Sequence, residues 1–336
     1  MTKSQTSSPT PHKYLQEDDV SEDCKKLLST LPKERGWVGS YVYNYQGFWA
    51  LPRLIQGVIA CQRQYQAQDN DIILVTAPKS GTTWLKALLF SLVNRKKYPV
   101  FEKNHPLLVK NPHDLVPLLE QDLYVDGQVP DFSLFTSPTL IATHVPFASL
   151  PKSVQNSRTK LVYLCRNPRD TFISMWQFTN NLRLDSHRDT NSIEEMFDHF
   201  CKGVGLYGPF WDHVLGYWKE SIENSDKVLF LMYEEIKKQP KIQLKRLAEF
   251  LDCPFSIEEE DCRVVDEILR MCSFGNLRNL EVNVNGNMSA GMANKNFFRR
   301  GEVGDWKNYF TVEMNDRLNH IIEQKFHGSG LKFVYI

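Results

Sequence analysis

The chain has 336 residues, and 42% of them are hydrophobic, so it can bury a sizeable core. Its 40 basic and 40 acidic residues balance, which excludes a global electrostatic field that would recruit nucleic acid or an anionic membrane. Any anion-binding site must therefore be local.

The cysteines and the N-terminus indicate the compartment. Seven cysteines, an odd number without a CxxC pair, argue against a disulfide framework and against a zinc site. The polar start of the chain lacks the apolar stretch of a signal peptide, and no apolar run is long enough to cross a bilayer. We expect a soluble cytoplasmic protein with a mobile tail at residues 1–20 and one domain at residues 21–336.

Taken in chain order, the hydrophobic pattern alternates between strands and helices. Helical spacing of apolar residues predicts helices at 53–66, 82–95, 169–182, 192–201, 210–223, 242–251 and 312–326. Short apolar or β-branched runs predict buried strands at 72–76, 139–143, 160–165 and 227–232. This alternation predicts an α/β fold with a central parallel sheet flanked by helices, in which ligands bind at the carboxyl ends of the strands.

The segment PKSGTTW, residues 78–84, follows the first predicted strand and opens a helix. Gly81 allows the backbone to approach an oxyanion, and Thr82 and Thr83 lie where helix amides are unpaired. Lys79 precedes the glycine, whereas the lysine follows the last glycine in GxxxxGK[ST], so an ordinary ATP or GTP loop is a poor match. The segment predicts a P-loop-like anion site, and the alternative is a plain turn with an exposed lysine.

Two further segments carry cations that could bind a second anion. Arg166 stands at the end of the strand 160–165, where Asn167 can cap a helix that begins at Pro168 and contains Ser174 two turns later. Near the C-terminus, adjacent arginines in FFRRGEVGDW can bind phosphate or sulfate in bidentate geometry. Each cluster taken alone could equally be a solvated surface contact.

The three motifs PKSGTTW, RNPRDTFIS and FFRRGEVGDW, in this order, resemble those of the cytosolic sulfotransferases. Enzymes of this family transfer the sulfo group of 3′-phosphoadenosine 5′-phosphosulfate (PAPS) to small acceptors. Segments such as YQGFW (45–49) and NPHDLVP (111–117) are similar to the plant branch, which acts on flavonoids, brassinosteroids, hydroxyjasmonates and desulfoglucosinolates. Among these types, the hydroxyjasmonate enzymes look nearest.

The resemblance implies a set of nucleotide-binding residues. The 5′-phosphosulfate loop falls on Lys79, Ser80, Gly81, Thr82 and Thr83. The 3′-phosphate site falls on Arg166, Ser174, Arg299, Arg300 and Gly301. The adenine environment falls on Trp84, Tyr233, Ser273 and Phe274. A nucleotide with phosphates at both ends needs two cradles, which accounts for the separate cation clusters.

The resemblance also implies the catalytic residues. His144, at the end of the strand 139–143, corresponds to the general base, and Lys79 would stabilise the leaving phosphate. Ser174 would restrain Lys79 until the nucleotide is bound. Many animal relatives have a lysine at the position of Ala142, so Lys79 would carry more of the charge here. No metal cofactor is expected.

Several alternatives stay open at this point. A magnesium-dependent small-molecule kinase and a catalytically silent nucleotide-binding protein are the rival classes. The aromatic-rich segment 37–49 could line an acceptor pocket or pack onto the sheet, and Arg53 or Arg183 could bind a jasmonate carboxylate. The segment 307–316 resembles a dimer motif of animal relatives, so we expect a monomer or a weak homodimer whose partner is a small hydroxylated acceptor.

Overall fold

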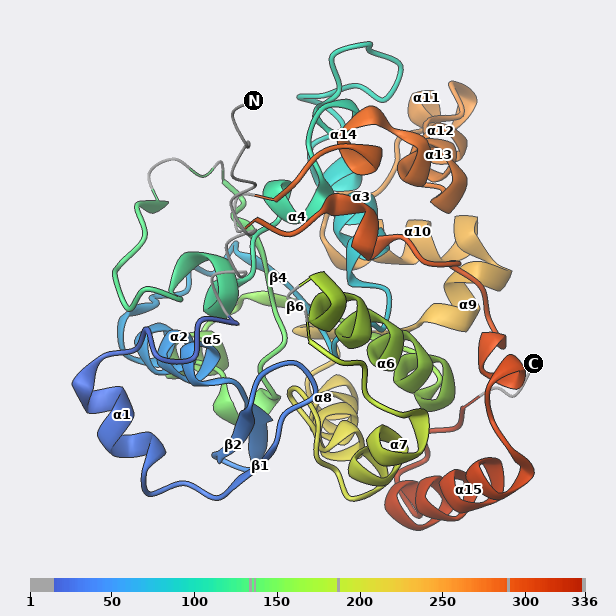
Figure 1. Ribbon diagram of the computed structural model, residues 1–336. Helices are drawn as coiled ribbons and strands as arrows, with labels where there is room; N and C mark the ends of the chain where they lie inside the picture. Colours follow the sequence, from blue (N-terminus) through green and yellow to red (C-terminus); the bar gives the residue numbers. More distant parts are fainter. Residues whose placement is uncertain (1–14, 133–134, 136, 186–187, 289–290, 334–336) are drawn as a thin grey trace, which may run out of the picture.

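The centre of the protein is a parallel sheet (Figure 1). The computed structural model describes residues 15–132, 135, 137–185, 188–288 and 291–333. The strand order of the sheet is β5-β4-β6-β7, and all neighbours are parallel. The strands span Ile72–Thr76 (β4), Leu140–Thr143 (β5), Lys160–Cys165 (β6) and Val228–Met232 (β7). Nearly every strand residue is buried, because helices cover both faces of the sheet.

Alternate residues of β4 point to two separate cores. Ile73 and Val75 join the core on one face, whereas Ile72 and Leu74 join the core on the other. The first face is covered by α2 (Pro52–Gln64), α6 (Pro168–Asp185), α7 (Ile193–Cys201), α8 (Phe210–Glu223) and α15 (Val312–Phe326). The second face is covered by α3 (Thr82–Val93), α9 (Tyr233–Lys238), α10 (Pro240–Phe250) and α12 (Val264–Met271).

A small antiparallel sheet and several short helices complete the described structure. The sheet has the order β1-β2-β3, with β1 at Lys33–Arg35, β2 at Tyr41–Tyr45 and β3 at Phe48–Ala50. The short helices are α1 (Glu22–Leu28), α4 (Pro112–Leu115), α5 (Lys152–Asn156), α11 (Ile257–Asp261), α13 (Phe274–Asn279) and α14 (Glu281–Val284). Among the helices within the described ranges, none has both the length and the apolar character needed to cross a membrane.

The predicted fold class is confirmed: an α/β architecture with a central parallel sheet between helices. The four predicted strands and seven predicted helices agree with the structure to within about three residues at each end. Residues 1–14 of the expected tail lie outside the described residues, while residues 15–20 contact the folded chain. There Asp19 pairs with Arg53 of α2, and Leu15 is buried.

Candidate active site

The carboxyl ends of the four parallel strands surround a cavity of about 350 Å³. Because all strands run the same way, the residues that follow them meet at one edge of the sheet. Of the predicted site residues, the cavity is lined by Lys79, Gly81, Thr82, Thr83, Trp84, His144, Arg166, Ser174, Tyr233, Ser273, Phe274, Arg299 and Gly301. The side chains of Ser80 and Arg300 do not reach the lining.

The turn between β4 and α3 has the backbone shape of an anion cradle. Gly81 precedes α3 with φ +111°, a left-handed conformation that favours glycine. A Cβ atom at this position would come within 2.8 Å of the Tyr233 ring, so the close approach also requires glycine. The cap of α3 makes no side-chain hydrogen bond to the first-turn N–H groups, and Thr82 and Thr83 of this turn line the cavity.

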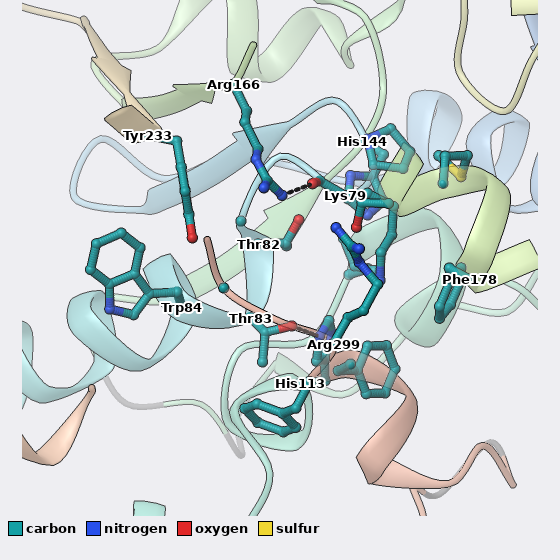
Figure 2. Close-up of a pocket in the computed structure, with 18 of the residues that line it drawn as sticks. Lys79, Thr82, Thr83, Trp84, His113, His144, Arg166, Phe178, Tyr233 and Arg299 are labelled. Atoms are coloured by element: carbon teal, nitrogen blue, oxygen red, sulfur yellow. Dashed lines mark hydrogen bonds between the residues drawn. The ribbon is translucent and has the colours of Figure 1, made fainter. Parts of the chain in front are cut away.

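The ammonium group of Lys79 lies against aromatic carbon (Figure 2). Its Nζ atom is 3.8 Å from the centroid of the Phe178 ring. Burial, with further contributions from Arg299 and Arg166, lowers the pKa of Lys79 to about 7. Among the described residues no hydrogen bond joins Lys79 to Ser174, which lies one helical turn before Phe178 and lines the same cavity.

His144 is held with a defined orientation at the end of β5. Its Nδ1 atom lies 2.7 Å from the carbonyl oxygen of Thr76 and donates to it, so Nε2 is the unprotonated nitrogen. The buried carboxylate of Glu120 accepts from the backbone N–H of His144 at 2.9 Å and from the hydroxyl of Thr143 at 2.8 Å. Burial lowers the pKa of His144 to about 3, so the imidazole is neutral at physiological pH.

Arg166 is anchored from two sides. Its guanidinium donates to the carbonyl of Glu302 at 2.7 Å and lies 4.6 Å from the centroid of the Tyr233 ring. The predicted cap of α6 is present, because the side chain of Asn167 accepts from the backbone N–H of Arg169 at 3.0 Å and the helix begins at Pro168. The sequence around Arg166 therefore fixes the arginine at the start of a helix, next to the cradle.

The loop 299–306 brings the remaining arginines to the cavity. Both Arg299 and Arg300 form ion pairs with the buried carboxylate of Asp305, and the Arg300 side chain is 47% exposed. The buried carboxylate of Asp170 accepts from the backbone N–H groups of Gly304 at 2.8 Å and Trp306 at 3.0 Å, which ties this loop to α6. Arg300 thus lies outside the cavity lining, while Arg299 is part of it.

Gly301 is required by the same packing. Its φ is +66°, and a Cβ atom there would come within 2.5 Å of the Phe274 ring. Phe274 follows Ser273, which caps α13 by accepting from the N–H of Asn276 at 3.3 Å. The predicted adenine environment and the predicted 3′-phosphate loop are therefore in direct contact.

Some residues of the cavity were missed from the sequence. Phe178 lies four residues after Ser174 on α6, a spacing that places both on one helix face. His113 belongs to NPHDLVP, a segment noted only as a family signature. Asn111 caps the short helix α4 that carries it by accepting from the N–H of His113 at 2.9 Å. The Asn-Pro pair was the local signal for this helix start.

Much of the cavity lining is apolar. It includes Leu15, Val38, Leu54, Leu118, Met175, Leu182, Leu206, Met288, Met292 and Phe297. Within the segment 37–49 only Val38 lines this cavity, while Trp37 and Phe48 are buried and Phe48 stacks on Tyr207 with 6.0 Å between centroids. The segment therefore mainly packs against the protein interior.

The two arginines that we suggested could bind the carboxylate of a jasmonate do not line the cavity. Arg53 is buried and pairs with Asp19 and Asp126, so its charge is already neutralised. Arg183 donates to the backbone carbonyl groups of Val38 and Asp189. Neither side chain lines the cavity, and this part of the prediction was wrong.

The fold and the site define an α/β protein in which a glycine-containing turn, cationic side chains and apolar side chains line one cavity at the ends of the parallel strands. Residues 69–330 match the sulfotransferase domain family. The chain is 49% identical to cytosolic sulfotransferase 12 of Arabidopsis thaliana over 329 residues, which cover 98% of this chain and 99% of that protein. It is 47% identical to Arabidopsis cytosolic sulfotransferase 11 over 320 residues, covering 95% and 91%. The chain therefore belongs to the sulfotransferase family.

Solved structures agree with this assignment. A crystal structure of an Arabidopsis thaliana sulphotransferase provisionally assigned to steroids is 44% identical, with a TM-score of 0.76, and covers 97% of this chain and 100% of that one. The structure of mouse sulfotransferase SULT7A1 complexed with PAP is 26% identical, with a TM-score of 0.66, and covers 86% and 95%. Family membership favours the sulfotransferase over the rival kinase class.

Proposed function

We propose that this protein transfers the sulfo group of PAPS to the hydroxyl group of a small, largely apolar acceptor. Sulfotransferase activity with PAPS as co-substrate follows from the family. The observation that carries the residue-level proposal is that Lys79 and His144 line one cavity together with Arg166, Arg299 and many apolar side chains. Burial is the main cause of the lowered pKa of His144, and the charges of Lys86 and Lys79 lower it further.

The chain fits a nucleotide with two anionic ends. The Nε atom of Arg166, which lines the cavity, is buried without a hydrogen-bond partner among the described residues, so it can bind a ligand oxygen. The Oγ atom of Ser80 also lacks such a partner, but its side chain lies outside the lining. Gly81 and Gly301 leave space that a Cβ atom would fill. We propose the following ligands for the 5′-phosphosulfate: Lys79, Ser80, Gly81, Thr82 and Thr83. For the 3′-phosphate we propose Arg166, Ser174, Arg299 and Gly301, together with Arg300, which would have to leave its ion pair with Asp305 to reach the ligand. For adenine we propose Trp84, Tyr233, Ser273 and Phe274.

The proposed mechanism is an in-line transfer. Bound PAPS supplies the sulfo group: the bond from sulfur to the bridging phosphate oxygen breaks, its electron pair stays on that oxygen, and the acceptor oxygen bonds to sulfur. His144 takes the acceptor's proton on Nε2, because Nδ1 already donates to Thr76. Lys79 and the amides at the start of α3 stabilise the negative charge that develops on the bridging oxygen. Ser174 lies near enough to the cradle to act as a further hydroxyl contact.

The lining supports a neutral acceptor. The cationic side chains of the cavity within the described ranges are Lys79, Arg166, Lys237 and Arg299. Arg166 and Arg299 belong to the proposed 3′-phosphate site, and Lys237 lies near the ring of Trp84, 5.7 Å from its centroid. The lining also includes an acidic residue, Asp122, whose carboxylate accepts from the backbone N–H of Leu118 at 2.7 Å. A flavonoid or a brassinosteroid suits this lining better than a hydroxyjasmonate anion, whose carboxylate would lack a cation there.

The remaining proposals concern compartment and assembly. Relatives are named cytosolic sulfotransferases, and we propose the same compartment for this chain. The expected dimer segment 307–316 includes the start of α15, where Val312 is 72% exposed. This exposed start of a helix is compatible with a weak homodimer, and sedimentation analysis across a concentration series would measure it.

The test is a panel of hydroxylated acceptors incubated with sulfur-labelled PAPS. The panel should pair neutral flavonols and brassinosteroids with hydroxyjasmonate as free acid and as methyl ester. We expect transfer to neutral members and a faster reaction of the ester than of the acid. Transfer to no member, in a protein that binds PAP by calorimetry, would support the catalytically silent alternative instead.

A further inference from the structure

A fully buried lysine lies behind the anion cradle. Lys86 is on α3, one turn after Thr83, and its side chain is inaccessible to solvent. Its Nζ atom is 3.2 Å from Nδ1 of His113, and Nε2 of the same ring is 2.9 Å from Oγ1 of Thr83 (Figure 2 shows the Thr83–His113 contact). The three side chains form a continuous chain of hydrogen bonds from the interior to the cavity, which Thr83 and His113 both line.

The direction of these hydrogen bonds follows from the chemistry of the ends. A lysine ammonium group can only donate, so Nδ1 of His113 accepts and the ring hydrogen is on Nε2. That N–H then donates to the oxygen of Thr83. A hydroxyl that accepts this bond keeps its own hydrogen for another acceptor, and the open side of Thr83 is the cavity.

The charges around Lys86 favour this direction. Burial lowers the pKa of Lys86 to about 8, while the carboxylates of Asp122, Glu120 and Asp114 act in the opposite direction, so the amine is mainly charged at neutral pH. Burial first, and then the charges of Lys86 and Lys79, hold the pKa of His113 well below its ordinary range. A neutral imidazole between a cation and a hydroxyl has one favourable tautomer, with hydrogen on Nε2.

Packing fixes the ring as well. His113 stacks on Phe297 with 4.1 Å between centroids and an interplanar angle of 28°. The ring is therefore clamped between an aromatic face and two hydrogen-bond partners, so its orientation is set before any ligand arrives. A methionine at position 86 would fill similar space without the cost of burying a charge, so packing alone does not account for a lysine at this position.

We propose that Lys86 and His113 are positioning residues whose relay points the hydroxyl hydrogen of Thr83 into the cavity, as a preorganised donor to the sulfonated 5′ end of the nucleotide. This inference rests on the proposed function for the identity of the acceptor oxygen. The relay itself is a property of the nucleotide-free protein. A hydroxyl with a fixed orientation needs no reorientation during the reaction, so it stabilises the negative charge that develops on the oxygens at the 5′ end of the nucleotide.

The first test reads the tautomers directly and needs no ligand. In protein labelled with ¹⁵N-histidine, the ring nitrogens of His113 should report hydrogen on Nε2. Those of His144, which donates from Nδ1 to Thr76, should report the opposite tautomer and serve as the internal control. In Lys86→Met, His113 should shift toward the Nδ1–H form, since Thr83 can then donate to Nε2, and His144 should not change. Hydrogen on Nδ1 of His113 in wild type, or an unchanged tautomer in the variant, overturns the relay.

The second test is a double-mutant cycle of Lys86→Met and Thr83→Val. Lys86→Met alone should lower kcat about 10-fold, as loss of one charge-assisted hydrogen bond does, with acceptor KM changed less than about 2-fold. In the Thr83→Val background the same change should lower kcat less than about 2-fold, because the hydroxyl that it orients is absent. Equal losses in both backgrounds would mean that Lys86 acts only through general packing.

A matched control separates this effect from the general loss of a lysine. Lys227 donates to the carbonyl groups of Val154, Gln155 and Ser157 at 2.6–2.8 Å and does not line the cavity. Lys227→Met should lower the unfolding temperature and leave kcat unchanged. If wild-type protein transfers no sulfo group to any acceptor, the proposed function fails, but the tautomer measurement still decides whether the relay exists.

Discussion

Arg299 offers the sharpest test of the nucleotide site. Its guanidinium lines the cavity with 22% of the side chain exposed, and in the nucleotide-free protein it pairs with Asp305. A charge-assisted hydrogen bond contributes about 1.5 to 3 kcal/mol. Because Asp305 already satisfies part of the guanidinium, we take the lower part of that range. Arg299→Ala should then weaken PAP binding by about 10- to 30-fold, since roughly 1.4 kcal/mol corresponds to a factor of ten.

The assay is isothermal titration with PAP and with adenosine 5′-monophosphate, which lacks the 3′-phosphate. Affinity for the monophosphate should change little in Arg299→Ala, because the lost partner is absent from that ligand. Arg270→Ala is the matched control, since Arg270 forms an exposed ion pair with Glu267 and does not line the cavity. An equal loss for both nucleotides would refute the assignment of Arg299 to the 3′-phosphate.

Five further outcomes follow from the proposed catalytic residues. His144→Ala should reduce transfer to an alkyl hydroxyl more than transfer to an acidic phenol, and equal losses in the two rates would contradict a general base. Since the pKa of His144 is lowered to about 3, this group stays neutral as pH falls, so wild-type kcat/KM should show no His144-dependent decline between pH 7 and about 5. Lys79→Met should lower kcat at least about 100-fold. Activity of the wild type should survive EDTA, because in the proposed mechanism this lysine, and not a metal ion, stabilises the negative charge on the bridging oxygen. The pKa of Lys79 is about 7 in the folded protein and 10.5 ordinarily, so between these pH values the unfolded chain binds more protons than the folded one. The free energy of unfolding of the wild type, measured in urea, should therefore rise from pH 7 to 9 relative to that of Lys79→Met, by at most about 1.4 kcal/mol per pH unit.

The elements that were predictable from sequence are those with a strong local pattern. The strand Ile72–Thr76 is a run of buried apolar residues, and α15 (Val312–Phe326) carries a regular apolar stripe. The antiparallel sheet was missed because β1 has only three residues, all of them exposed, so it carries no hydrophobic pattern. Only its antiparallel pairing with β2 makes it a strand. Helices of four to eight residues such as α12 and α14 were missed as well, because short helices are stabilised mainly by the packing around them.

The site residues, too, were predictable where the local sequence is distinctive and were missed where only the tertiary structure places them. Lys79, Arg166 and Arg299 belong to motifs with a distinctive local sequence, and the structure brings all three to one cavity. Lys86 gave no signal, because a lysine inside a helical pattern normally reaches solvent and only the tertiary structure shows that it is buried. Arg300 was predicted beside Arg299, but adjacent residues in a loop point in different directions, and Asp305 holds it outside the cavity lining.

Partners within the chain hold the cations of the site in place. Arg299 pairs with Asp305, Arg166 donates to the carbonyl of Glu302, and Lys79 lies on the ring of Phe178. Each partner restrains a cation without fully replacing the interaction that a phosphate oxygen would provide, so little reorganisation is needed when the nucleotide binds. Holding a charged lysine in this site is unfavourable, as the lowered pKa of Lys79 indicates, and burial and the two arginines cause this shift together. In the proposed mechanism, an anionic nucleotide would reverse that shift and restore the ammonium form of Lys79, so the burial that disfavours its charge without a counter-anion would strengthen its interaction with one.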